Sequence, residues 1–205
     1  MNPNYAKARR HATRRLIQEL SPKLSYHNLA HTLDVIERAV DLGERIGVDE
    51  TDMLLLKTAA AYHDIGFIDC VAGHEQIGAE YAGEVLGEYG YSAEQIVTVQ
   101  ELILATQLSR TPQTLLEQIM SDADLDILGR PDFLSRSCDL RDEVNALGNT
   151  ISLREWYLQQ HRFLSSQTYS TATARDTREA GKADNLKLLM RLVDEIDAKK
   201  KRTQT

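Results

Sequence analysis

The sequence is poor in helix-breaking residues and in aromatic residues. Four prolines and 11 glycines among 205 residues leave room for long helices. The aromatic fraction is 6% within an ordinary hydrophobic fraction of 42%, so aliphatic side chains must fill most of the core. Alternating apolar and polar runs bounded by turn residues are also missing, which removes the usual signal for strands. These features favour an all-α fold.

Cysteine pairs, a signal peptide and a membrane span are lacking as well. Cys70 and Cys138 do not make a disulfide framework and favour a reducing compartment. The polar, basic segment Met1–Arg15 has no apolar centre of the kind that a signal peptide carries. No apolar run approaches the roughly 20 residues that a membrane span requires. We therefore predict a cytoplasmic protein with no membrane partner.

The formal net charge of -7 repels polyanions, so we expect no nucleic-acid binding. The basic clusters near Arg9–Arg15 and Lys199–Arg202 are interpreted as solvated helix surface. A small phosphorylated ligand stays compatible with the acidic chain, because one local metal ion outweighs the global charge. The sequence does not determine the oligomeric state.

Helical spacing of apolar residues recurs along the chain. Ile96, Val99 and Ile103 share one helix face, and Ser92 with Gln95 forms a capping box that begins this helix. The pattern predicts a single-domain helical bundle over 1–205, with a catalytic core at about 24–130 and C-terminal helices at 131–200 packing on it. The expected helices span 3–20, 27–46, 50–64, 74–89, 92–108, 112–123, 131–146, 152–166 and 172–200.

Histidine and aspartate gather in short segments of the first two thirds of the chain. His27 and His31 are four residues apart, so on a helix they would share one face. His63 and Asp64 are adjacent at the end of an apolar helix, where burying both is costly without a partner. A metal ion is a natural partner for an imidazole next to a carboxylate.

A third segment, Asp122–Ala123–Asp124–Leu125–Asp126, places three carboxylates within five residues. A nearby cation would relieve their mutual repulsion. The segment is not an EF-hand loop, because the glycine and the distal glutamate of that loop are at the wrong spacing. Each segment alone is a weak signal, whereas the three together, in this order, indicate a metal site.

The order of a His, a His-Asp doublet and a distant Asp resembles the HD superfamily of metal-dependent phosphohydrolases. The resemblance covers His27–Arg130 and implies an all-α bundle of the HD/phosphodiesterase type. Its four metal-binding positions are matched by His31, His63, Asp64 and Asp124. Asp122 competes with Asp124 for the last position, and we favour Asp124 because it follows a small residue and precedes Leu125.

The first motif, Tyr26–His31, resembles the Tyr-His-Asn-x-x-His motif of cyclic-nucleotide phosphodiesterases. The resemblance implies that His27 donates a proton and that Asp64 belongs to the catalytic centre. The doublet is followed by Ile65–Gly66–Phe67, which is neither the second Asp-His pair of those enzymes nor the Ile-Gly-Lys of the HD-GYP group. The substrates of those two groups are therefore not carried over, and the chain is most similar to bacterial predicted HD phosphohydrolases.

Three further residues are candidates for supporting roles. His74 follows the doublet closely and is a candidate ligand of a second ion. Lys57 and Arg130 are candidates for binding a substrate phosphate. His11 and His161 lie outside the matched region and are interpreted as structural.

These assignments predict a hydrolase that acts on a phosphomonoester or phosphodiester bond of a small molecule, with a nucleotide as the favoured substrate. The expected cofactor is one divalent ion, with a second left open, chosen from Mn, Fe, Co, Ni and Mg because no thiolate ligand is in evidence. Two alternatives stay open. One is an HD-type di-iron oxygenase, and the other is a non-catalytic nucleotide-binding regulator.

Overall fold

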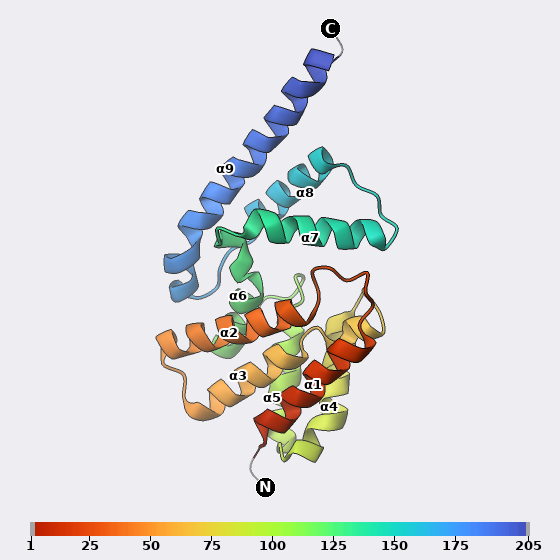
Figure 1. Ribbon diagram of the computed structural model, residues 1–205. Coiled ribbons are helices and arrows are strands. Elements are labelled where there is room, and N and C mark those ends of the chain that lie inside the picture. Colours follow the sequence, from red (N-terminus) through yellow and green to blue (C-terminus); the bar gives the residue numbers. More distant parts are fainter. Residues whose placement is uncertain (1–2, 204–205) are drawn as a thin grey trace. The chain divides into compact units, whose positions relative to one another are not determined.

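A computed structural model describes residues 3–203, and within that range the chain forms helices and turns without a β-strand (Figure 1). The all-α prediction is confirmed. The backbone divides into two compact units, with the boundary between Leu125 and Asp126. No helix in the described range has the length and apolar character to cross a membrane. The single-domain organisation and the cytoplasmic location stay predictions.

The first unit contains helices α1 to α6, with α3 at their centre because α1, α2, α5 and α6 all contact it. Small residues make this possible, since Ala59, Ala60 and Ala61 let neighbouring helices approach the α3 backbone, and all three are buried. The elements are α1 (Tyr5–Glu19), α2 (Leu29–Ile46), α3 (Glu50–Tyr62), the 3-10 helix η1 (Ile65–Ile68), α4 (His74–Val85), η2 (Leu86–Tyr89), α5 (Ala93–Leu104) and α6 (Leu115–Asp124).

The second unit is built around a pair of contacting helices, α8 and α9 (Figure 1). Arg154 on α8 forms a bidentate ion pair with Asp197 on α9, at 2.7 and 2.9 Å. Asn185 on α9 donates hydrogen bonds to backbone carbonyls of residues 128 and 130, which ties α9 to the beginning of the unit. The elements are η3 (Leu125–Gly129), α7 (Phe133–Ala146), α8 (Leu153–Ser166) and α9 (Ala172–Thr203).

The start of α2 differs from the sequence-based expectation. The helix begins at Leu29, because the Asn28 side chain accepts hydrogen bonds from the backbone N–H groups of Ala30 and His31, at 2.9 and 3.3 Å. Asparagine is among the strongest N-cap residues. His27 precedes this cap, so the prediction that His27 and His31 share a helix face is wrong. The position of the His31 side chain is set by helix α2, whereas that of His27 is not.

Two glycines bring η1 and α4 into direct backbone contact. A Cβ atom on Gly66 would lie 2.0 Å from the carbonyl oxygen of His74, and one on Gly78 would lie 3.1 Å from the carbonyl oxygen of Tyr62. Only glycine allows these approaches without movement of the backbone. The pair therefore sets the distance between the segment after His63 and the beginning of α4.

We expect Gly66→Ala to destabilise the protein by about 1–3 kcal/mol, because the added methyl group overpacks a contact with backbone atoms. Gly87→Ala is the matched control, since a Cβ atom there meets nothing within 4 Å. Urea unfolding measures the free energy of unfolding of both variants. Equal stability of the two variants would contradict the importance of this backbone contact.

Candidate metal centre

Four polar side chains of the first unit converge from three helix ends. His31 lies in the first turn of α2, His63 and Asp64 directly follow α3, and Asp124 is the last residue of α6. His31, His63 and Asp64 are at most 5% exposed, while the Asp124 side chain is 21% exposed. The cluster is therefore buried on three sides and reaches solvent near Asp124.

The Nε2 atoms of the two histidines lie close to each other and to one oxygen of each aspartate, and the ligand atoms of His31, His63 and Asp124 all lie within 4.8 Å of one another. The Nε2 atoms of His31 and His63 are 3.4 Å apart. Asp64 Oδ2 lies 3.4 Å from His31 Nε2 and 3.2 Å from His63 Nε2, and the corresponding distances for Asp124 Oδ1 are 3.2 and 3.6 Å. Ligand atoms about 2.0–2.3 Å from one ion are separated by roughly 3–3.5 Å when they are adjacent. The donor set fits a single divalent cation.

Hydrogen bonding outside the cluster supports the same interpretation. His63 Nδ1 lies 2.9 Å from the carbonyl oxygen of Ala60, which only accepts, so Nδ1 carries the proton. The Nε2 lone pair of the neutral ring then faces the cluster, as in histidines that bind metals. Asp64 Oδ2 is buried and accepts no hydrogen bond from the described residues, although two imidazoles are near it. A bound cation would provide a partner for both His63 Nε2 and Asp64 Oδ2.

Electrostatics in the absence of an ion show that the cluster needs positive charge. Burial works to lower the pKa of His63, but the Asp64 and Asp124 carboxylates beside it raise this pKa to about 9. Burial works to raise the pKa of Asp64, but the imidazoles of His63, His74 and His31 hold it well below the ordinary value. A proton on His63 thus supplies the charge that a cation would provide.

His74 faces the other oxygen of Asp64. Its Nε2 atom lies 3.5 Å from Asp64 Oδ1, while its Nδ1 atom lies 3.0 Å from the carbonyl oxygen of Val71. Nδ1–H donates a hydrogen bond to the Val71 carbonyl, so Nε2 is the ring nitrogen that faces Asp64. Asp64 therefore presents one oxygen to the pair of His31 and His63 and the other to His74.

His27 lies beside the cluster in a turn. The backbone N–H of Asn28 donates to the carbonyl of Tyr26, so His27 is the central residue of a three-residue turn. The His27 ring is 5.8 Å from that of His31 and 6.2 Å from that of His74, measured between centroids. The structure thus brings His27 next to His31 and His74, by a turn instead of a shared helix.

The three aspartates at the end of α6 have different surroundings. Asp124 belongs to the cluster, whereas Asp122 is buried within α6 and is not one of the convergent donors. Asp126 belongs to the second unit, where Arg178 binds both of its oxygens, at 2.6 and 3.2 Å. The cation beside Asp126 is therefore the guanidinium of Arg178, and Asp126 is not one of the convergent donors.

The remaining candidates have partners within their own units. The Lys57 ammonium lies over the Tyr5 ring, 4.6 Å from its centroid. Arg130 forms a bidentate ion pair with Asp132, at 2.9 and 2.7 Å. The phosphate-binding roles of Lys57 and Arg130 stay predictions.

The two histidines interpreted as structural lie on α1 and α8. His11 on α1 lies between two hydroxyl groups, 2.5 Å from that of Tyr81 and 2.6 Å from that of Tyr89, which links α1 to α4 and η2. This arrangement agrees with a structural role for His11. His161 is half-buried on α8.

Sequence reasoning did not assign roles to Asn28 and Arg178. Asn28 begins the helix that carries His31, and a signal for it was present, because an Asn directly before an apolar helical pattern is a typical N-cap. Arg178 is 52 residues from Asp126, and no local pattern links the two.

Comparison with known proteins agrees with this geometry. Residues 28–126 match the HD domain family, so this segment of the chain, which contains all four convergent residues, is an HD domain. The fold resembles that of a predicted HD superfamily hydrolase from an uncultured Thermotogales bacterium, with 22% identity, a TM-score of 0.63, and coverage of 94% of this chain and 93% of that chain. It also resembles Bacillus subtilis YpgQ, solved in complex with ADP, with 18% identity, a TM-score of 0.65, and coverage of 93% and 96%. No curated protein matches the sequence significantly.

We expect metal binding at pH 7 to release at least one proton per ion. His63 is protonated there, because its pKa is about 9 without an ion, and a ligand must lose that proton. Protons therefore compete with the ion below the pKa, and affinity rises by about tenfold per pH unit from neutrality towards pH 9. Calorimetric titration with Mn²⁺ in buffers of different ionisation enthalpy measures the release. A binding enthalpy independent of the buffer would contradict this role of His63.

Proposed function

We propose that this HD domain is a metal-dependent phosphohydrolase that cleaves a phosphoester bond of a small molecule. The observation that carries the proposal is the set of His31, His63 and Asp124, whose ligand atoms lie within 4.8 Å of one another, together with the buried Asp64 oxygen that faces both imidazoles and accepts no hydrogen bond from the described residues. The four residues would hold Mn, Fe, Co, Ni or Mg, because hard oxygen and imidazole donors without thiolates suit these ions better than a closed structural zinc site. Asp64 and His74 are the residues that would hold a second ion.

The residues of the site have different roles in the proposed hydrolysis. When a divalent ion is bound, it supplies Lewis-acid chemistry that activates water and polarises the phosphate. Asp64 faces the imidazoles of His31 and His63 with one oxygen and that of His74 with the other, which fixes its orientation in the buried part of the site. His27 donates a proton to the oxygen that leaves phosphorus, because its imidazole lies beside that of His31 and can act as a general acid there.

We infer that the substrate is a small phosphorylated molecule and favour a nucleotide. The YpgQ structure holds ADP, and the likeness between the two folds extends over most of both chains. The net charge of -7 disfavours a nucleic-acid polymer as substrate. Lys57 and Arg130 are the candidates for contacts with phosphate, and each would have to exchange the partner that it holds here.

The two alternative functions make different demands on the site. A di-iron oxygenase generally needs additional histidine ligands, and His74 is the imidazole that faces the outer oxygen of Asp64. A non-catalytic regulator would not require the complete set of four donors together with a proton donor. The hydrolase is therefore the better-supported proposal.

A hydrolysis screen tests the proposed function. The purified protein is incubated with phosphomonoesters, nucleotides and cyclic nucleotides, each with Mn²⁺, Fe²⁺, Co²⁺, Ni²⁺ or Mg²⁺, in air and under nitrogen. We expect release of phosphate or of a nucleoside monophosphate that does not depend on oxygen. Turnover that strictly requires oxygen and two irons would favour the oxygenase, and bound metal without any turnover would favour the regulator.

We expect His27→Ala to retain metal and fold while losing roughly 10²–10⁴-fold in kcat, because the departing oxygen loses its proton donor. The loss should be much smaller with p-nitrophenyl phosphate, whose leaving group needs no proton, than with phenyl phosphate. His31→Ala should instead lose the metal. His161→Ala, on α8, is the control for removing a half-buried histidine. Equal losses on both substrates, or loss of metal in His27→Ala, would show that His27 is not the proton donor.

A further inference from the structure

Helix geometry does not determine the direction of the His27 side chain. His27 precedes the Asn28 cap and belongs to the turn between α1 and α2, so no helix holds it. Its ring is nevertheless close to those of His31 and His74, where a proton donor must be. A proton donor acts efficiently only when its orientation is fixed, because a misplacement of about 1 Å can cost a hundredfold in rate. The groups packed against the His27 ring therefore bear on its orientation.

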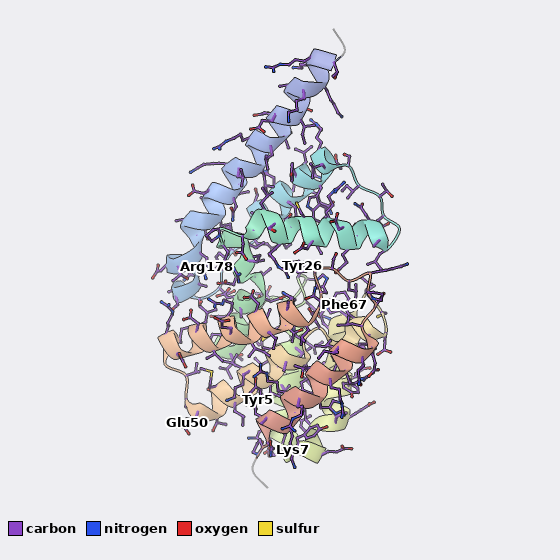
Figure 2. The ribbon with its side chains drawn as sticks, viewed as in Figure 1. Tyr5, Lys7, Tyr26, Glu50, Phe67 and Arg178 are labelled. Atoms are coloured by element: carbon purple, nitrogen blue, oxygen red, sulfur yellow. The ribbon has the colours of Figure 1, made fainter. Side chains whose placement is uncertain are left out.

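Phe67 is the neighbour that stacks on the His27 ring. The two rings are nearly parallel, with an interplanar angle of 19° and centroids 4.3 Å apart. The contacts of His27 with Tyr26 and His31 are edge-on instead, at 77° and 89°. Tyr26 belongs to the same turn as His27 and moves with it. Phe67 comes from η1 and provides a surface independent of that turn; Figure 2 labels Tyr26 and Phe67.

The Phe67 ring itself is held firmly. It is 6% exposed, and it stacks also on His74, with centroids 3.8 Å apart and an interplanar angle of 28°. His74 is anchored by its hydrogen bond to the Val71 carbonyl. The backbone of η1 is fixed against α4 by the close approach at Gly66. The orientation of Phe67 is thus set by α4 and η1, both of which are independent of the turn that carries His27.

We propose that Phe67 is a positioning residue that orients His27 for proton donation. This inference rests on the proposed function for the role of His27. Phe67 takes no part in the chemistry, but its face restricts the imidazole to one plane beside the convergent residues. An aliphatic side chain of similar volume would fill the same space without imposing that plane, because stacking depends on the geometry of the aromatic ring.

The experiment compares Phe67→Leu and Phe67→Tyr in the full chain loaded with Mg²⁺. We expect Phe67→Leu to lower kcat for phenyl phosphate by about tenfold, with KM and bound metal unchanged and a much smaller loss with p-nitrophenyl phosphate. Phe67→Tyr, which keeps the ring, should restore most of the rate. Phe133→Leu removes an equally buried phenylalanine from the second unit and controls for a general loss of packing.

Two further measurements separate orientation from packing. In the double variant with His27→Ala, Phe67→Leu should cost nothing more, because the residue to be oriented is gone. The NMR signals of the His27 ring, identified by their loss in His27→Ala, should move towards those of a free imidazole in Phe67→Leu and not in Phe67→Tyr. Additive losses in the double variant, or unchanged His27 signals in Phe67→Leu, would overturn the proposal. Because the NMR measurement requires no turnover, it decides the orienting contact even if the proposed hydrolysis fails.

Discussion

The structure depends on holding two imidazoles and two carboxylates together in a largely buried place. Bringing charged groups out of water costs several kcal/mol per ion unless their charges are balanced. His31, His63, Asp64 and Asp124 balance one another only when a proton or a cation lies between them, and the raised pKa of His63 expresses that demand. The stability of the fold and the chemistry of the site therefore depend on the same residues. The groups that would bind an ion are also those whose burial lowers the stability of the protein when no ion is bound.

The surrounding packing serves this convergence. The small residues of α3 let α1, α2, α5 and α6 surround it, and the backbone contact at Gly66 and Gly78 sets the position of α4 relative to η1. His74 then faces the outer oxygen of Asp64, and the Phe67 ring contacts the rings of both His74 and His27. One short segment after α3 thus supplies a pair of donors, a tight backbone contact and an aromatic surface.

Much of this arrangement could be predicted from the sequence. Helix existence follows from the spacing of apolar residues and from caps such as Ser92 with Gln95, which the structure confirms as a capping box. The residues of the cluster could be selected because their order resembles a known family. The local conformation of His27 was missed, since helical spacing outweighed the capping signal of Asn28. Contacts between distant residues, such as that of Asp126 with Arg178, leave no local pattern, and neither does the stacking of Phe67 on two histidines.

All four convergent residues lie at helix ends, and this has a consequence for how the chain can vary in length. The α2–α3 connection is exposed at Gly47, and the longer α5–α6 connection is braced by Arg110, which pairs with Glu101. Residues inserted into such connections leave the rotational register of each helix unchanged. One residue inserted within α3 would instead turn everything after it by about 100° about the helix axis and carry His63 and Asp64 away from His31. Among homologous chains, the numbers of residues between the segments that carry the donors are therefore free to drift, while the phase of each donor relative to its own helix is not.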